Sequence, residues 1–218
     1  ITVNKEEDVA HFENNMGKGF TMLETALHPW RNPQDTLEWE VWHKLHLLLG
    51  YAHFKKKKDL LNARTYYEDA RAIYQDTLQL ADVYLAEHIL IQLGNIHNRL
   101  RDYEKSYYFL NQAKDICVQL EAYDKAALAI NSLGVNIRDR GNWLEAIGYY
   151  QEGLTYPNLK LENIVQLSLN LAEALAVTGQ LDSSRQITLE CQNILEKKSV
   201  DFDPEFVLEY WADLHENL

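Results

Sequence analysis

The sequence is poor in cysteine, in basic residues and in long apolar runs. Two cysteines in 218 residues cannot build the disulfide framework of a small secreted domain, so we expect a reducing, cytoplasmic compartment. No apolar run approaches the roughly 18 residues that a membrane-spanning helix requires, and we expect no secretory signal peptide. Because the first residue is Ile1 rather than methionine, we expect the sequence to be a piece of a longer protein.

Acidic residues outnumber basic ones by 33 to 21, which gives a formal net charge of −12 at pH 7. This charge disfavours nucleic acid and anionic membrane surfaces as partners. The run of four lysines at residues 55–58 is a local exception. Because it is short and lacks interleaved aromatic residues, we interpret it as a solvated turn rather than a nucleic-acid site.

Motifs for catalysis and for cofactor binding are also missing. The stretch MGKGF at residues 16–20 lacks the flanking glycines, strand and Ser/Thr of a phosphate-binding loop, and no nucleophile elbow or zinc-protease motif occurs. His43 and His46 stand three residues apart on one predicted helix, but no third metal ligand accompanies them. We therefore expect no enzyme activity, no cofactor and no metal site.

What the sequence does contain is one pattern that occurs four times. Each copy begins with a small residue, has a second small residue 12 or 13 positions later, then a residue that is usually large after four positions, and a small one after three more. The copies are Gly50, Ala63, Tyr67, Ala70; Gly94, Ser106, Leu110, Ala113; Gly134, Ala146, Tyr150, Gly153; and Ala172, Ser184, Thr188, Cys191.

This spacing predicts pairs of antiparallel helices. A small residue midway along the first helix lets the second helix approach closely, and a large residue fills the space beside it. Turn residues stand between the two helices of each copy, as KKD, RDY, GNW and GQL. Each pair has an apolar face that it cannot bury alone, so pairs must stack. The helices are expected at 35–54, 59–76, 80–100, 102–120, 122–140, 142–155, 161–178 and 181–197.

The pattern resembles the tetratricopeptide repeat (TPR) family over roughly residues 36–198. Its spacing is similar to the extended subclass with repeats of about 40 residues, as in kinesin light chains, polarity adaptors, and bacterial peptide-sensing or signal-activated regulators. The resemblance implies an all-α, right-handed superhelical solenoid. We expect an N-terminal helical segment at 1–34, either separate or part of an incomplete repeat, four TPR-like pairs at 35–198, and a C-terminal helix at 199–218 that either caps the array or starts a further repeat.

In this family the first helix of each pair lines a concave groove. The family register places the following residues there: Lys44, Tyr51, Phe54, Lys55, His88, Ile91, Asn95, Asn98, Arg99, Leu128, Asn131, Val135, Arg138, Gln166, Asn170 and Glu173. The asparagines can donate and accept hydrogen bonds at once, which suits a peptide backbone. Arg99 and Arg138 stand at nearly equivalent positions and are expected to form a local anion site. The peptide-binding residues we expect are Lys44, Tyr51, His88, Asn95, Asn98, Arg99, Asn131, Arg138 and Asn170.

These observations favour a module that holds a peptide or partner segment in its groove, without direct binding of nucleic acid or membrane. Two alternatives remain at this point: the sensor domain of a bacterial TPR-type transcription regulator that lacks its DNA-binding part, and a scaffold that binds through its convex face. An uncapped end would favour homo-oligomers. His53 and His97 are interpreted as packing residues, and Cys117 and Cys191 as unpaired core thiols.

Overall fold

The computed structural model describes residues 18–19, 21–25 and 33–198, and within these ranges the regular structure is entirely helical. The helices are α2 (Thr36–Ala52), α3 (Leu60–Ala72), α4 (Val83–Leu85), α5 (Ile91–Arg99), α6 (Tyr103–Gln119), α7 (Tyr123–Asp139), α8 (Trp143–Leu154), α9 (Leu161–Val177) and α10 (Leu181–Lys198). The π-helical turns His53–Lys57 and Ile73–Thr77 extend α2 and α3, and a third, Ala86–Leu90, joins α4 to α5. The segment expected at 1–34 falls largely outside the described residues, and the helix expected at 199–218 falls wholly outside them.

The turn inside each pair uses one local device. A residue in the left-handed conformation follows the first helix, and the second helix begins two residues later. These turn residues are Lys58, Arg101, Gly141 and Gly179, with φ of 53°, 61°, 89° and 84°. Asp59 and Asp102 then cap α3 and α6 by accepting the backbone N–H groups of Asn62 and Lys105. The turns predicted from KKD, RDY, GNW and GQL are confirmed.

The small residues allow close contact between the two helices of each pair. A Cβ atom on Gly50 would lie 2.8 Å from the ring of Tyr67, and one on Gly94 would lie 2.5 Å from Leu110. A Cβ atom on Gly134 would overlap the ring of Tyr150. The second small residues, including Ala63, Ser106 and Ala146, are fully buried. The expected small-to-large contact is confirmed in the first three pairs.

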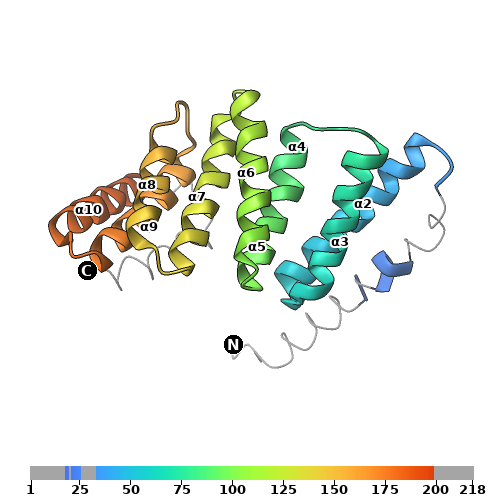
Figure 1. The fold of residues 1–218 in the computed structure, drawn as a ribbon, viewed down its shortest axis with the longest axis horizontal. Coiled ribbons are helices and arrows are strands. Elements are labelled where there is room, and N and C mark those ends of the chain that lie inside the picture. The colour runs from blue at the N-terminus through green and yellow to red at the C-terminus, as the bar shows by residue number, and fades with distance from the viewer. Residues whose placement is uncertain (1–17, 20, 26–32, 199–218) are drawn as a thin grey trace, which may run out of the picture.

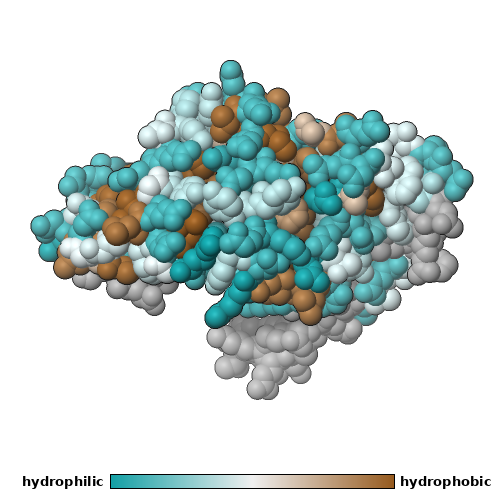
Figure 2. All heavy atoms as spheres, in the orientation of Figure 1, coloured by the Kyte–Doolittle hydropathy of each residue, from teal (hydrophilic) through white to brown (hydrophobic). Residues whose placement is uncertain are grey.

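The pairs stack in chain order, from α2 and α3 at one end to α9 and α10 at the other (Figure 1). Each pair contacts its neighbours in the chain. One apolar core extends through most of the array, with residues such as Leu90, Leu133 and Leu167. A separate, smaller apolar cluster lies in the last pair and consists of Val165, Leu169, Cys191 and Leu195. The face in Figure 2 is mostly hydrophilic, with hydrophobic residues in separate patches. The expectation of an all-α solenoid of antiparallel helix pairs is confirmed.

The glycine contact leads to a stability prediction. Gly134→Ala is expected to lower the free energy of unfolding by about 1–3 kcal/mol, because the new methyl group would overlap Tyr150. The matched control is Gly148→Ala in α8, where a Cβ atom meets nothing within 4 Å, and alanine should raise stability by roughly 0.5–1 kcal/mol. Urea denaturation measures both changes. Equal effects of the two substitutions would show that Gly134 is not a contact point.

Candidate functional site

The inner side of the array is formed by the first helix of each pair. Neighbouring first helices lie close together, since Cα atoms of α5 and α7, and of α7 and α9, approach within 8 Å of each other. The second helices α6 and α8 also meet through long side chains, with the hydroxyls of Tyr107 and Tyr149 3.2 Å apart. Because backbones approach on the side of the first helices, the array curves toward that side. The candidate groove therefore lies along α2, α5, α7 and α9.

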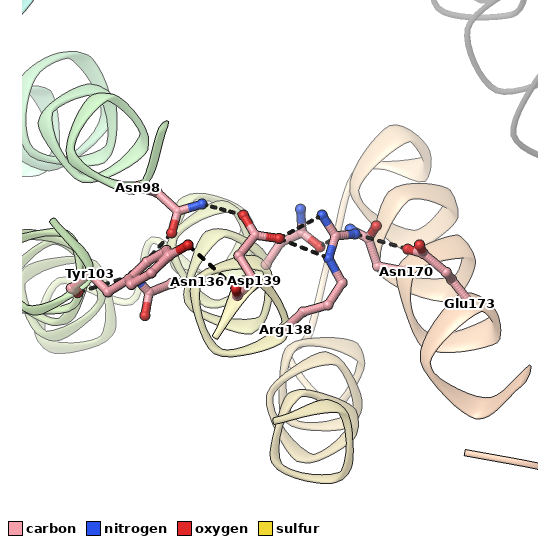
Figure 3. A network of polar contacts seen from close by, with 8 residues as sticks. Asn98, Tyr103, Asn136, Arg138, Asp139, Asn170 and Glu173 are labelled. Atoms are coloured by element: carbon pink, nitrogen blue, oxygen red, sulfur yellow. Dashed lines mark hydrogen bonds and ion pairs between the residues drawn. The ribbon is translucent and has the colours of Figure 1, made fainter. Parts of the chain in front are cut away.

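Polar side chains link α5 to α7 in the C-terminal half of this groove (Figure 3). Asn98 donates to the carboxylate of Asp139 at 2.6 Å. Asn136 donates both to Asn98 Oδ1 and to the carbonyl oxygen of Tyr103, each at 3.1 Å. Asn98 is only 9% exposed and Asn136 is fully buried. The NH2 groups of both amides and the oxygen of Asn98 are therefore hydrogen-bonded within the protein, whereas Asn136 Oδ1 has no hydrogen-bond partner among the described residues.

A second set of contacts links α7 to α9. Arg138 pairs with Glu173 at 2.8 Å and with Asp139 at 3.2 Å. Asn170 donates to Asn131 Oδ1 at 2.7 Å, and Asn131 is only 6% exposed. The prediction that Asn131 and Arg138 point into an open groove, away from the helix interfaces, is wrong. Both side chains bridge two helices.

The charge of Arg138 is neutralised where it stands. Burial alone would lower the pKa of Arg138, but Glu173, Tyr150 and Asp139 outweigh burial and raise that pKa above its ordinary value. The guanidinium therefore stays charged and paired with two carboxylates. The anion site expected from Arg99 together with Arg138 does not form at Arg138.

The N-terminal half of the groove is different, because it contains an open pocket of about 320 Å³ between α2 and α5. We call it the Tyr51 pocket. It is lined by Leu47, Leu48, Tyr51, Lys55, Tyr67, His88 and Gln92. Leu48 is 52% exposed and Tyr51 is 49% exposed, so the pocket presents apolar surface to solvent.

Two cations lie beside this pocket over a single aromatic ring. Lys55 Nζ lies 5.3 Å and Arg99 Cζ 4.9 Å from the ring centroid of Phe54. The ring itself is 2% exposed. Within the described part of the chain, no carboxylate forms an ion pair with Lys55 or Arg99. Both positive charges are therefore available to an anionic ligand.

The groove residues form two matching rows. One row lies on α2 and the π-helical turn after it, and the other lies on the π-helical turn Ala86–Leu90 and α5. Both rows repeat at helical spacing and lie on neighbouring first helices. Lys44, Leu48, Tyr51 and Lys55 stand opposite His88, Gln92, Asn95 and Arg99 in the repeat register. Among the described residues, the amide groups of Gln92 and Asn95 have no hydrogen-bond partner. Each row spans about 16 Å at 1.5 Å per residue.

The family register found part of this site and missed part of it. Tyr51 and His88 were predicted and line the Tyr51 pocket, while Lys44 lines a smaller pocket beside it. Leu48 and Gln92 were missed, although they stand at the register position of Asn170, which was predicted. Phe54 and Ile91 were expected to line the groove, but both are buried, at 2% and 5% exposure. That prediction is wrong because the first helix of a pair also buries residues beside its groove face against neighbouring helices.

The histidines and cysteines singled out by the sequence lie in the core. His53 and His97 are 5% and 0% exposed. Burial lowers the pKa of His97 although Asp102 and Glu68 lie 3.3 Å and 3.6 Å from its ring nitrogens. Cys117 and Cys191 are unpaired, and burial raises the pKa of each thiol to about 11. Both thiols are therefore protonated and inert at neutral pH.

The described residues show no other chemical site. No three His, Cys, Asp or Glu side chains among them are grouped so that they could hold a metal ion. None of the helices in the described ranges is long and apolar enough to span a bilayer.

The asparagine contacts predict which amide groups support the fold. Asn136→Ala is expected to lower the free energy of unfolding by about 1–3 kcal/mol, since it removes the donor to Asn98 Oδ1 and to the Tyr103 carbonyl oxygen. Asn95→Ala is the matched control, because Asn95 is only partly buried and its side chain has no hydrogen-bond partner among the described residues. Thermal denaturation followed by circular dichroism measures both variants. A large loss in Asn95→Ala, equal to that in Asn136→Ala, would contradict the assignment.

No family model matches the sequence, and no curated protein matches it. Solved structures, however, share its fold. The crystal structure of BtubC (BKLC) from P. vanneervenii aligns with a TM-score of 0.74 at 17% sequence identity, over 90% of this chain and 79% of that one. A putative kinesin light chain from Podosopora anserina with nearly identical TPR-like repeats aligns with a TM-score of 0.67 at 14% identity, over 88% and 94% of the two chains. The chain has the TPR-like helical-repeat fold that its four-copy pattern predicts.

Proposed function

We propose that this protein is an interaction module that holds an acidic peptide segment of a partner protein in the N-terminal half of its concave groove. The observation that carries this proposal is that two cations, Lys55 and Arg99, lie over the Phe54 ring at the edge of the Tyr51 pocket. Among the described residues, neither forms an ion pair with a carboxylate. On a chain with a net charge of −12, two adjacent cations without a carboxylate partner favour an anionic ligand.

The dimensions of the two rows suit an extended peptide. A length of about 16 Å corresponds to roughly five residues of an extended strand at about 3.3 Å per residue. Gln92 and Asn95 offer amide donors and acceptors midway along one row, which can pair with the N–H and C=O groups of the ligand backbone. Leu48 and Tyr51, on the opposite row, offer apolar contact to alternate ligand side chains.

The C-terminal half of the groove has a structural role in this proposal. Asn98, Asn131, Arg138 and Asn170 are engaged with neighbouring helices, so a peptide would have to break existing hydrogen bonds to use them. Among the residues expected from the sequence, Lys44, Tyr51, His88, Asn95 and Arg99 are therefore the ones we retain for ligand contact.

The experiment begins with selection of peptides from a random displayed library against the whole chain. Selected peptides should be enriched in aspartate and glutamate. In calorimetric titration of one such peptide, Arg99→Glu and Lys55→Glu are each expected to weaken binding about tenfold or more, which corresponds to about 1.4 kcal/mol or more. The effect should shrink at high salt, because the replaced charges are exposed.

The matched control is Arg185→Glu in α10, which introduces the same charge change at an exposed residue far along the array. It should leave affinity nearly unchanged, and all three variants should keep the melting temperature of the wild type. If Arg185→Glu weakens binding as much as Arg99→Glu, the attraction is a general charge effect. If both groove variants bind normally, the ligand uses another surface, and the convex-face scaffold replaces the proposal.

A further inference from the structure

The Tyr51 pocket combines apolar walls with a cation in its own lining. The cation is Lys55, and the apolar walls are formed by Leu47, Leu48, Tyr51 and Tyr67. Leu48, Tyr51 and Lys55 are exposed, so a ligand that enters from solvent can reach them. Because the cation belongs to the wall of the pocket, a side chain that enters meets apolar surface and positive charge together. The pocket therefore favours a side chain with an apolar body and an anionic end.

The pocket also has room for an aromatic ring. Its volume is about 320 Å³, and an enclosed apolar cavity of about 150 Å³ is large enough to hold benzene. The ring of Tyr67 closes one side, because it lies against the backbone of Gly50, where a Cβ atom would be 2.8 Å from it. The short side chain of aspartate or glutamate would leave much of this volume empty and part of the apolar wall without contacts.

The positive charge beside the pocket exceeds what one carboxylate neutralises. Because Lys55 Nζ and Arg99 Cζ lie 5.3 Å and 4.9 Å from the centroid of the same Phe54 ring, they are at most about 10 Å apart. None of the residues that line the pocket is acidic, and Glu87, 4.0 Å from His88 Nε2, lies outside the lining. A phosphate group carries about −1.5 to −2 charges at pH 7 and three acceptor oxygens. It can therefore pair with an ammonium and a guanidinium group at once.

We propose that the Tyr51 pocket binds a phosphotyrosine side chain of the partner segment. The ring would lie between Leu48 and Tyr67, and the phosphate would pair with Lys55 and Arg99 at the edge of the pocket. Phosphoserine has the charge without the ring, and phenylalanine has the ring without the charge, so neither uses both features. This inference rests on the proposed function, since it names the residue that the groove recognises within the acidic segment.

The test is a nuclear magnetic resonance titration of the whole chain, followed through the ring signals of Tyr51. The probes are the N-acetyl, N-methylamide forms of phosphotyrosine, tyrosine, phosphoserine and glutamate. Phosphotyrosine should produce saturable shifts at a concentration at least tenfold below that of each other probe, because only it combines the ring contact with the double charge. If phosphoserine binds as tightly, the site recognises phosphate alone. If tyrosine binds as tightly, the charge is not required. Either result would overturn the phosphotyrosine site.

Two further outcomes separate this inference from the proposed function. If glutamate binds as tightly as phosphotyrosine, while peptides from the displayed library still depend on Lys55 and Arg99, the acidic segment stands and the phosphotyrosine is overturned. A heptapeptide with a central phosphotyrosine should bind more tightly than phenyl phosphate, because Gln92 and Asn95 can pair with its backbone. Equal affinity for phenyl phosphate would identify a free aryl phosphate as the ligand and overturn the partner segment in both proposals.

Variants connect the shifts to the pocket. Leu48→Ser removes exposed apolar wall, so it should weaken the phosphotyrosine probe about fivefold and leave the phosphoserine probe unchanged. Lys55→Gln should weaken both probes, because both carry the phosphate. Leu189→Ser, at an exposed leucine of α10, is the matched control for Leu48→Ser and should bind as the wild type does. Wild-type affinity for phosphotyrosine in both Leu48→Ser and Lys55→Gln, with melting temperatures unchanged, would overturn the proposal.

Discussion

The structure depends on the close approach of two antiparallel helices at a single small residue. Where Gly50 or Gly134 lacks a side chain, the ring of Tyr67 or Tyr150 lies directly against the backbone of the first helix. This contact fixes the distance between the two helices, and a short turn with one left-handed residue can then connect them. The remaining apolar surface of each pair has to be covered by the next pair, which extends the protein in one direction.

The two halves of the groove differ because their first helices are joined differently. Between α5, α7 and α9, amide and carboxylate side chains bond across the helices and fill the inner surface (Figure 3). Among the described residues, no side-chain hydrogen bond joins α2 to α5. Leucine and tyrosine stand at the corresponding positions of α2, and a pocket is left open there. The inner surface is therefore filled by its own polar residues in one half, whereas the other half contains an open pocket.

The sequence was sufficient for the fold because the relevant contacts lie within one repeat. Gly94 and Leu110 belong to the same copy, and so do Arg101 and Asp102 in its turn, so their spacing alone predicted the helix pair. The site was predicted only in part. Whether Asn98 faces solvent or Asp139 depends on how far α5 is rotated relative to α7. The spacing of residues within one helix gives no information about that rotation.

The same limit applies to the cations. Arg99 and Arg138 have similar positions in the sequence, yet Arg138 meets Glu173 from the next pair, whereas Arg99 meets the Phe54 ring from the preceding pair. Arg99 stands five residues after its leading glycine and Arg138 four, so the two side chains differ by one position around the helix. Their partners lie about 35 to 45 positions away, and a single sequence does not show which of these residues will meet. Counting positions from the leading small residue of each copy remained useful, because Leu48 and Gln92 occupy the same position relative to that residue as Asn170 does.

The fourth pair holds its helices together by a different contact. Ala172 replaces the glycine, and the hydroxyl of Ser184, at the position of Ala146, donates to the Ala172 carbonyl oxygen at 2.7 Å. Thr188, at the position of Tyr150, donates to Ser184 on its own helix. This pair therefore buries less side-chain volume at its centre than the others do. In an array whose units are stabilised by their neighbours, local opening should begin here, so amide hydrogens of α9 and α10 should exchange with solvent before those of α7 and α8.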